Sequence, residues 1–546
     1  MASSRAGYYL RSEWEPGGSP GFWAGDGAQD LGLEGRVGEP ELEAVLAGLH
    51  PAAGGRLNPF PTRVAAVDLT FAVPKSVSVL WGLGPPEVAR AVEAGRDAAA
   101  RSALAYLERQ VSQARPGGAV VAVFGHGTSR AADPHVHAHA VVANVFGAGE
   151  RWRATDRPVL IAHVATAGFL FDAELRHRLH LALGARFGEV DNGVAQLAGM
   201  PADLRREFSR RRHQVEAAMS AHGGASPASA RLAAVAGRPA KEVGVELAEL
   251  RRRWVGRAEG RGSPAEEWGG WLTGAADRAP DGEGSAGDEG VLRRAIGHLS
   301  PLSSLSRRDV LRAVCSSLPQ GAPVERVEEL GERLLSGPAL DRLDGPTPHR
   351  RQDVIRRSDG RLVVIGTDPG RWSTVEHRAH VRRAVEIAAA GRGRGEPLAG
   401  TIAAPAGSAV DRVAAQLCRS TDRVVLLSAD GPPGAEAPVV EAAARMWRAA
   451  GRPVVAVAPD AASAAELEAR TGVPAAGMAA HLDECRRLGR PPAAVVVIAG
   501  ANGVPAAQLA DALEEGSRRA VTTVLVAGRP GLPAADRGGA WRAIEA

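Results

Sequence analysis

Three histidines stand at alternate positions in the stretch HVHAHAVVANV, residues 135–145. A β-strand points residues two apart to the same face, so His135, His137 and His139 are expected in a row on one side of a strand. A fourth histidine, His126, lies in the apolar stretch just before. Two adjacent strands would bring three or four imidazoles around one point, and such a donor set can hold a divalent metal ion while leaving positions open for a substrate oxygen.

Two more residue types could act beside such a metal. The chain has three tyrosines, and two of them, Tyr8 and Tyr9, are adjacent near its start. A phenol becomes a nucleophile when a neighbouring base or a metal-polarised substrate assists it, although Tyr9 could instead pack on a sheet. Asp68, which precedes the apolar run LTF, could accept a proton or orient a histidine. Its alternative is a turn residue at a strand edge.

Composition narrows the class of protein. A chain of 546 residues is too long for a single core, so several domains are expected. The three cysteines are far apart, which indicates a reducing compartment without disulfides. No run of about 18 apolar residues and no export signal is apparent, so a cytoplasmic protein without membrane insertion is expected. A net charge of +4 permits a nucleic-acid partner without requiring one.

The elements that must position these residues form an α+β domain with an antiparallel sheet. A strand, a Pro-Lys break and the start of a helix are expected over 63–83. The other expected elements are a long helix over 85–110, two antiparallel strands over 118–129 and 135–145, and helices near 158–184 and 201–222.

The order of these motifs resembles the N-terminal domain of conjugative relaxases of the MobF (TrwC/TraI) class. The resemblance is carried by YYL, then DLTFAVPKSVSVLWGL, then FGHGTSRAADPHVHAHAVVANV, and it extends over about residues 8–257. It implies a His-hydrophobic-His (HUH) endonuclease fold. Such an enzyme nicks one DNA strand at an origin of transfer through a 5′-phosphotyrosyl intermediate.

The resemblance also implies roles for single residues. Tyr8 matches the nucleophile, and Asp68 matches an aspartate that assists the tyrosine and orders the histidines. His126, His137 and His139 match ligands of a divalent ion, for which we expect Mg²⁺ or Mn²⁺. His135 falls where relatives usually carry another residue, so it is expected to be incidental or to support the ligands.

DNA contacts are expected from Arg130, which matches an arginine beside the site, and from Tyr9 and Lys75. The run RRR at 210–212 could follow a DNA backbone, but a helical arginine run is more often a solvated face. Some relatives have a second tyrosine pair downstream, and Leu10 to Leu33 contains none. Only seven residues precede Tyr8, too few for the usual first strand at full length, so either the start is trimmed or that strand is short.

The second half of the chain predicts a different architecture. Apolar runs alternate with helices from about residue 400, as in a parallel α/β sheet. This part resembles the first half of a RecA-like helicase domain without its chemistry. The stretch VVLLSADGPPGAEAP (424–438) lacks the Gly-Lys-Ser/Thr ending of a P-loop, and Ala499 and Gly500 replace an Asp-Glu pair. We therefore predict neither ATPase nor helicase activity.

The expected domains are a relaxase domain (1–257), a flexible linker (258–290), a helical intermediate region (291–400) and a degenerate RecA-like domain (401–546). The predicted function is metal-dependent nicking and strand transfer on single-stranded origin DNA. Expected partners are this DNA and, by resemblance, a type IV coupling protein and accessory relaxosome proteins. The alternatives are an inactive origin-binding protein derived from a relaxase and a replication initiator with the same fold.

Overall fold

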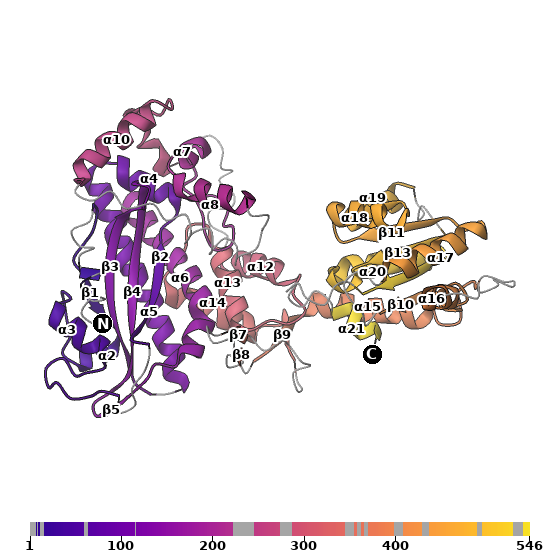
Figure 1. Ribbon diagram of the computed structural model, residues 1–546, viewed down its shortest axis with the longest axis horizontal. Coiled ribbons are helices and arrows are strands. Elements are labelled where there is room, and N and C mark those ends of the chain that lie inside the picture. Colours follow the sequence, from indigo (N-terminus) through magenta and orange to yellow (C-terminus); the bar gives the residue numbers. More distant parts are fainter. Residues whose placement is uncertain are drawn as a thin grey trace. The chain divides into compact units, whose positions relative to one another are not determined.

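The computed structural model forms two compact units (Figure 1). The first comprises residues 1–295, 307–333 and 345–369, and the second comprises 296–306, 334–344 and 370–546. The structure describes residues 7, 9–10, 16–58, 64–114, 116–221, 245–273, 287–343, 354–356, 362–364, 370–397, 408–428, 436–488, 494–527 and 539–545.

The first unit contains a five-stranded antiparallel sheet in the order β1-β3-β4-β2, with β5 also paired to β4. The predicted hairpin is its centre, since β3 and β4 pair along most of their length with His126 opposite His137. The strands are β1 (Phe22–Ala24), β2 (Ala66–Ala72), β3 (Gly118–Thr128), β4 (Pro134–Ala148) and β5 (Arg151–Arg153).

Strand alternation gives this sheet two different faces. Val136, Ala138 and Ala140 of β4 are fully buried on one face, which is covered by two long helices, α5 (Pro86–Ala114) and α6 (Arg157–Leu183). Phe71 of β2 contacts Phe171 of α6 there, with ring centroids 5.2 Å apart. The opposite face carries the histidines, as their alternate positions in one strand predict.

The histidine face is only partly covered. At one end of β3 and β4 it packs in a core with the short helices α2 (Asp26–Asp30) and α3 (Glu39–Leu46), through residues such as Trp23 and Leu42. Toward the other end, Asp68, Thr70 and Ala72 of the edge strand β2 are exposed. In the described part of the chain, the face beside the histidines is therefore exposed at Thr70 and Ala72.

Of the remaining helices of this unit, those near 75, 201 and 307–336 were predicted from the sequence, whereas no helix was predicted over 247–259 or 270–273. The helix expected over 201–222 is broken at Phe208, whose buried side chain separates two shorter helices. The helices are α4 (Lys75–Leu83), α7 (Ala202–Glu207), α8 (Arg210–Ala221), α10 (Leu247–Glu259), α11 (Gly270–Thr273), α12 (Asp288–Leu299), α13 (Arg307–Ser316) and α14 (Val324–Ser336), with the 3₁₀ turn η2 (Ala265–Glu267).

The start of the expected linker has an ordered structure. Residues 258–273 contain the end of α10, η2 and α11. Trp268 and Trp271 are buried there, with ring centroids 5.9 Å apart. The glycine-rich composition predicts a linker, but two tryptophans supply enough apolar surface to hold this segment in place. Residues 274–286 lie outside the described part of the chain.

The structure divides residues 291–400, expected as one helical region, between the two units. Helix α13 packs on α6, because Arg176 of α6 is fully buried and donates hydrogen bonds to the carbonyls of Cys315 and Leu318. Glu174 accepts a hydrogen bond from the backbone of Val324, at the start of α14. Strands β7 (Val354–Arg356) and β8 (Leu362–Val364) also pair in this unit.

One described helix, α6, is long and apolar enough to cross a membrane by length and composition. This corrects the prediction that no such segment exists. Half of its apolar window is buried inside the unit, where Leu170, Phe171 and Leu175 belong to the core. A core helix passes the same test, and these contacts account for its apolar character.

The second unit contains a five-stranded parallel sheet in the order β10-β14-β13-β11-β12. This confirms the predicted parallel α/β architecture, with cores on both faces of the sheet. Strands β6 (Leu340–Arg342) and β9 (Trp372–Thr374) form a separate antiparallel pair. The other elements are β10 (Val424–Leu427), β11 (Val454–Ala458), β12 (Ala475–Gly477), β13 (Val495–Ala499), β14 (Thr522–Val526), α15 (Val375–Ala390), α16 (Ala409–Cys418), α17 (Ala437–Ala449), α18 (Ala461–Thr471), α19 (Met478–Leu488), η3 (Ala501–Gly503), α20 (Ala506–Arg518) and α21 (Gly539–Glu545).

Candidate metal centre

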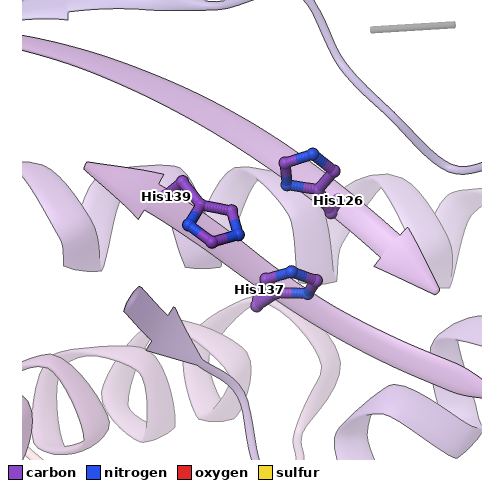
Figure 2. Close-up of side chains that lie close together, drawn as sticks. All are labelled: His126, His137 and His139. Carbon is purple, nitrogen blue, oxygen red and sulfur yellow. The ribbon is translucent and has the colours of Figure 1, made fainter. Parts of the chain in front are cut away.

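Three imidazoles meet on the partly covered face of the first sheet. His126 comes from β3, while His137 and His139 come from β4, and the three rings gather over the two strands (Figure 2). One ring nitrogen of each lies within 4.8 Å of the others. The ring centroids are 5.0 to 5.2 Å apart. The predicted ligand residues are therefore brought together by the pairing of β3 with β4.

Hydrogen bonds orient two of these rings. Nδ1 of His139 lies 2.9 Å from Oδ1 of Asp68, on the adjacent strand β2. Nδ1 of His137 lies 2.8 Å from the backbone carbonyl of His135. A carboxylate or carbonyl acceptor fixes the proton on Nδ1, which makes Nε2 the nitrogen that can bind a metal. Two imidazoles oriented in this way, together with that of His126, fit a divalent ion of the transition series.

Asp68 connects the histidines to a tyrosine. The hydroxyl of Tyr9 donates a hydrogen bond to Oδ2 of Asp68 at 2.9 Å. The Tyr9 ring stacks on Phe124, with centroids 5.7 Å apart, and lies 6.4 Å from the His139 ring. The two oxygens of one carboxylate therefore face a phenol and a candidate metal ligand. Tyr8, the predicted nucleophile, lies outside the described residues.

The other residues expected to contact DNA lie beyond the imidazole cluster. Arg130 is in the turn after β3, where it lines a pocket with Ser129 and Leu250. Lys75 is the first residue of α4, and its Nζ donates a hydrogen bond to the carbonyl of Pro134 at 2.7 Å. Burial lowers the pKa of Lys75 to about 8, with the charge of Asp133 opposing and that of Arg257 adding to this shift.

His135 belongs to the row but not to the cluster of possible ligands. Its ring stacks on that of His137, with centroids 4.7 Å apart. Burial, followed by the positive charges of His137, Lys75 and His139, lowers the pKa of His135 to about 3. The ring is therefore neutral near pH 7.

A network at the base of the hairpin was missed by sequence reasoning. The buried carboxylate of Asp133 accepts hydrogen bonds from the side chains of Arg210 and Arg257 and from the backbone of Arg210. Arg257 also contacts Glu207. The first arginine of the RRR run thus binds the turn that follows β3, whereas Arg212 pairs with Glu216 on an exposed face. The motif Asp-Pro before the histidines was the only sequence signal for this network.

Comparisons with known proteins agree with two different domains. The family model described as TrwC relaxase matches residues 1–260, and the one described as AAA domain matches residues 410–546. Two proteins called Multifunctional conjugation protein TraI, from Escherichia coli and from its strain K12, are 30% identical to this chain over 242 residues. The alignment covers 40% of this chain and 13% of each relative, so the chain spans a small part of their length.

Solved structures of conjugative relaxase TrwC with oriT DNA are also similar to this chain. The metal-bound form has 28% sequence identity and a TM-score of 0.43. The metal-free form has the same identity and a TM-score of 0.42. Both matches cover 48% of this chain and 95% of the TrwC chain.

Proposed function

We propose that this chain nicks one strand of an origin of transfer and can rejoin it, because the family model described as TrwC relaxase matches residues 1–260. The observation that carries the proposal is the continuous set of contacts from Tyr9 through Asp68 to His139 and its neighbouring imidazoles. A phenol, a carboxylate and three imidazoles lie close together, and this supports the proposal because transesterification of a phosphodiester can use a tyrosine nucleophile, a base and a bound metal ion.

The proposed step exchanges one phosphate ester for another. A tyrosine oxygen forms a bond to the scissile phosphorus, and the bond from phosphorus to the 3′-oxygen breaks. The phenol loses its proton, and the departing 3′-oxygen gains one, so the products are a 5′-phosphotyrosyl link and a 3′-hydroxyl. No water is consumed, and the reverse reaction can therefore rejoin the strand.

His126, His137 and His139 would hold the metal ion. A divalent cation bound there supplies Lewis-acid polarisation of the phosphate. The residues of the chain orient the reactants, since Asp68 holds His139 and accepts the phenolic hydrogen of Tyr9. Of the two ions expected, Mn²⁺ suits an all-imidazole set better than Mg²⁺, which prefers oxygen ligands.

Two tyrosines are candidates for the nucleophile. The position of Tyr8 in the family motif favours Tyr8, and we propose it as the attacking residue. The hydrogen bond from Tyr9 to Asp68 favours Tyr9 as the second candidate. With Tyr8 as nucleophile, Tyr9 would position Asp68 and stack against Phe124 at the floor of the site.

The test uses single-stranded oligonucleotides that tile the DNA flanking the gene, each labelled at its 3′ end. Incubation of the chain with Mn²⁺ should give one labelled protein band that survives denaturation, and mass spectrometry of its peptides should identify the tyrosine. Chelation of the metal and His137→Ala should each abolish the band. Specific binding of one oligonucleotide without any covalent band would instead support the inactive origin-binding alternative.

The AAA domain, residues 410–546, is proposed to lack ATPase and helicase activity. Helix α17 begins after Glu436 with a proline in its first turn, and its early residues Ala437 and Val439 are buried. Phosphates bind at helix N-termini through exposed backbone N–H groups, and a carboxylate there repels them. Residues 429–435, in the stretch that lacks the P-loop ending, lie outside the described residues.

The proposed reaction sets the cellular context. The substrate would be single-stranded origin DNA in the cytoplasm, which agrees with three free, buried cysteines. A type IV coupling protein and accessory relaxosome proteins are proposed as partners. Co-purification of the tagged chain from cells that carry the element, with and without its origin, would test these partners.

A further inference from the structure

The metal-ligand assignment leaves His135 without a role. His135 precedes His137 by two residues on β4, so the two side chains share a face. Their rings stack, with centroids 4.7 Å apart. The His135 side chain is half-buried and thus partly open to solvent. It extends the imidazole row away from Asp68 and Tyr9, toward the end of β4 where the strand begins.

Lys75 lies at that same end of the row. Its ammonium group donates a hydrogen bond to the carbonyl of Pro134, the residue next to His135. Lys75 is also one of the charged groups that act electrostatically on His135. Asp133 and Arg257 are its other charged neighbours, and the carboxylate of Asp133 already binds Arg210 and Arg257. Lys75 and His135 thus bring an ammonium group and an imidazole nitrogen close together, and each can donate a hydrogen bond to a bound ligand.

The choice of lysine at this position is unusual for the chain. Only two of its 66 Lys and Arg residues, Lys75 and Lys241, are lysines. The Lys75 side chain is partly buried. An ammonium is a compact point charge on a flexible stem, whereas a guanidinium is a wider planar fork.

The spacing along β4 suits an extended nucleic-acid strand. Two residues of a β-strand advance by about 6.6 Å, which is comparable to the separation of neighbouring phosphates in an extended single strand. The exposed edge strand β2 leaves this path open beside Thr70 and Ala72. A phosphate held by the triad would place its neighbour near His135 and Lys75.

We propose that Lys75 and His135 form a second phosphate subsite, which binds the phosphate adjacent to the scissile one. This inference rests on the proposed nicking function, because the scissile phosphate defines the register of the strand. The subsite would position the DNA and keep it extended across the metal centre. It would contribute affinity without taking part in bond exchange.

The first test measures binding of the full chain to a 20-residue oligothymidylate over a range of NaCl concentrations. The plot of log K against log salt has a negative slope, and each phosphate contact to a single strand steepens it by about 0.7. The plot for Lys75→Met should therefore be less steep than that for wild type by about 0.7. Lys75→Arg keeps the charge and should keep the slope. His135→Gln should weaken binding about threefold or more at every salt concentration with the slope unchanged.

Mn²⁺ titration without DNA is the control for both positions. Wild type, Lys75→Met and His135→Gln should bind Mn²⁺ equally. An unchanged salt slope in Lys75→Met would overturn the subsite, as would reduced Mn²⁺ affinity in His135→Gln, because His135 would then act on the metal. If Lys75→Met does not fold, His135→Gln still decides: unchanged affinity for the oligonucleotide would overturn the inference.

A neutral methylphosphonate in the identified origin strand tests the position of the subsite. A methylphosphonate at one of the two positions next to the cleavage site should weaken DNA binding by wild type. The same substitution should leave DNA binding by Lys75→Met unchanged, because that variant already lacks the contact. Equal weakening of both proteins at each flanking position would place Lys75 elsewhere on the strand. A chain that binds DNA with the expected slopes but never nicks would contradict the proposed function and leave the subsite in place.

Discussion

Asp68 and His139 face each other across the β2–β4 pair, with Oδ1 and Nδ1 2.9 Å apart. A carboxylate on the far nitrogen of a metal-binding histidine fixes its tautomer and raises its basicity. The two side chains are 34% and 23% exposed, so their contact lies near the surface. Such a contact contributes little to folding stability by itself, and its expected role is to orient the metal-binding histidine.

The first prediction concerns this carboxylate. Asp68→Asn keeps the shape of the side chain but removes its charge, and it should lower Mn²⁺ affinity by about 10- to 100-fold. Isothermal titration of the DNA-free chain measures the effect. Asp203→Asn, a change at a carboxylate that is 83% exposed, is the matched control and should bind Mn²⁺ as wild type does. Equal affinities for Asp68→Asn and wild type would remove Asp68 from the site.

The second prediction separates the two tyrosines. Tyr8→Phe should abolish the covalent DNA adduct because it removes the proposed attacking oxygen. Tyr9→Phe removes the hydrogen bond to Asp68 but leaves the proposed attacking oxygen in place, so the adduct should still form, about tenfold more slowly. Denaturing gels with a 3′-labelled strand give both rates. The opposite pattern, an adduct in Tyr8→Phe and none in Tyr9→Phe, would assign the attack to Tyr9.

The sequence predicted the ligand cluster because its geometry is local. Alternation within 135–145 and the short turn back to His126 almost fix the relation of these rings, once β3 and β4 pair as an antiparallel hairpin. The sequence identified Asp68 as a residue that could order a histidine. Which histidine it contacts depends on the register of β2 against β4. Only the structure shows that it is His139.

Features that depend on distant packing were not predictable. Nothing in the sequence around Arg176 indicates that its carbonyl partners lie about 140 residues further on, at Cys315 and Leu318. Composition likewise predicted a linker where Trp268 and Trp271 form a small buried contact, because average glycine and aspartate content conceals two large apolar side chains. The role of Asp133 was missed for the same reason, since its arginines come from two later helices.

The third prediction concerns Lys75 and pH. Its pKa falls from 10.5 in the unfolded chain to about 8 in the folded one. Between these values the unfolded chain binds more protons, so stability should rise with pH from about 8 to 10.5. The rise attributable to Lys75 is about 2 to 3 kcal/mol, and it should be absent in Lys75→Met. Urea unfolding of both proteins at pH 7.5, 9 and 10.5 tests this; parallel curves would show that Lys75 is not desolvated.

The fourth prediction concerns the packing of α13 on α6 in the first unit. Arg176→Ala removes the donor from three backbone carbonyls, those of Gly193, Cys315 and Leu318. It also leaves the buried Asp172 without its neighbouring positive charge. The free energy of unfolding of the first unit should fall by about 3 to 5 kcal/mol. Arg206→Ala, at a side chain that is 68% exposed, should change it by less than about 1 kcal/mol. Equal values for the two variants would mean that α13 is held by other contacts.

The last prediction concerns nucleotide binding by the AAA domain. A ligand present at 100 times its Kd stabilises a folded protein by about 2.7 kcal/mol, which thermal unfolding detects easily. We expect no rise in the Tm of the second unit with millimolar MgATP or MgADP, because α17 begins with Glu436 and a proline, and β13 ends at Ala499 without an acidic pair. Sodium sulfate at equal ionic strength controls for non-specific anion effects. A rise with MgATP beyond that seen with sulfate would show that the domain retains a nucleotide site, and hydrolysis assays would then be needed to decide whether it is an ATPase.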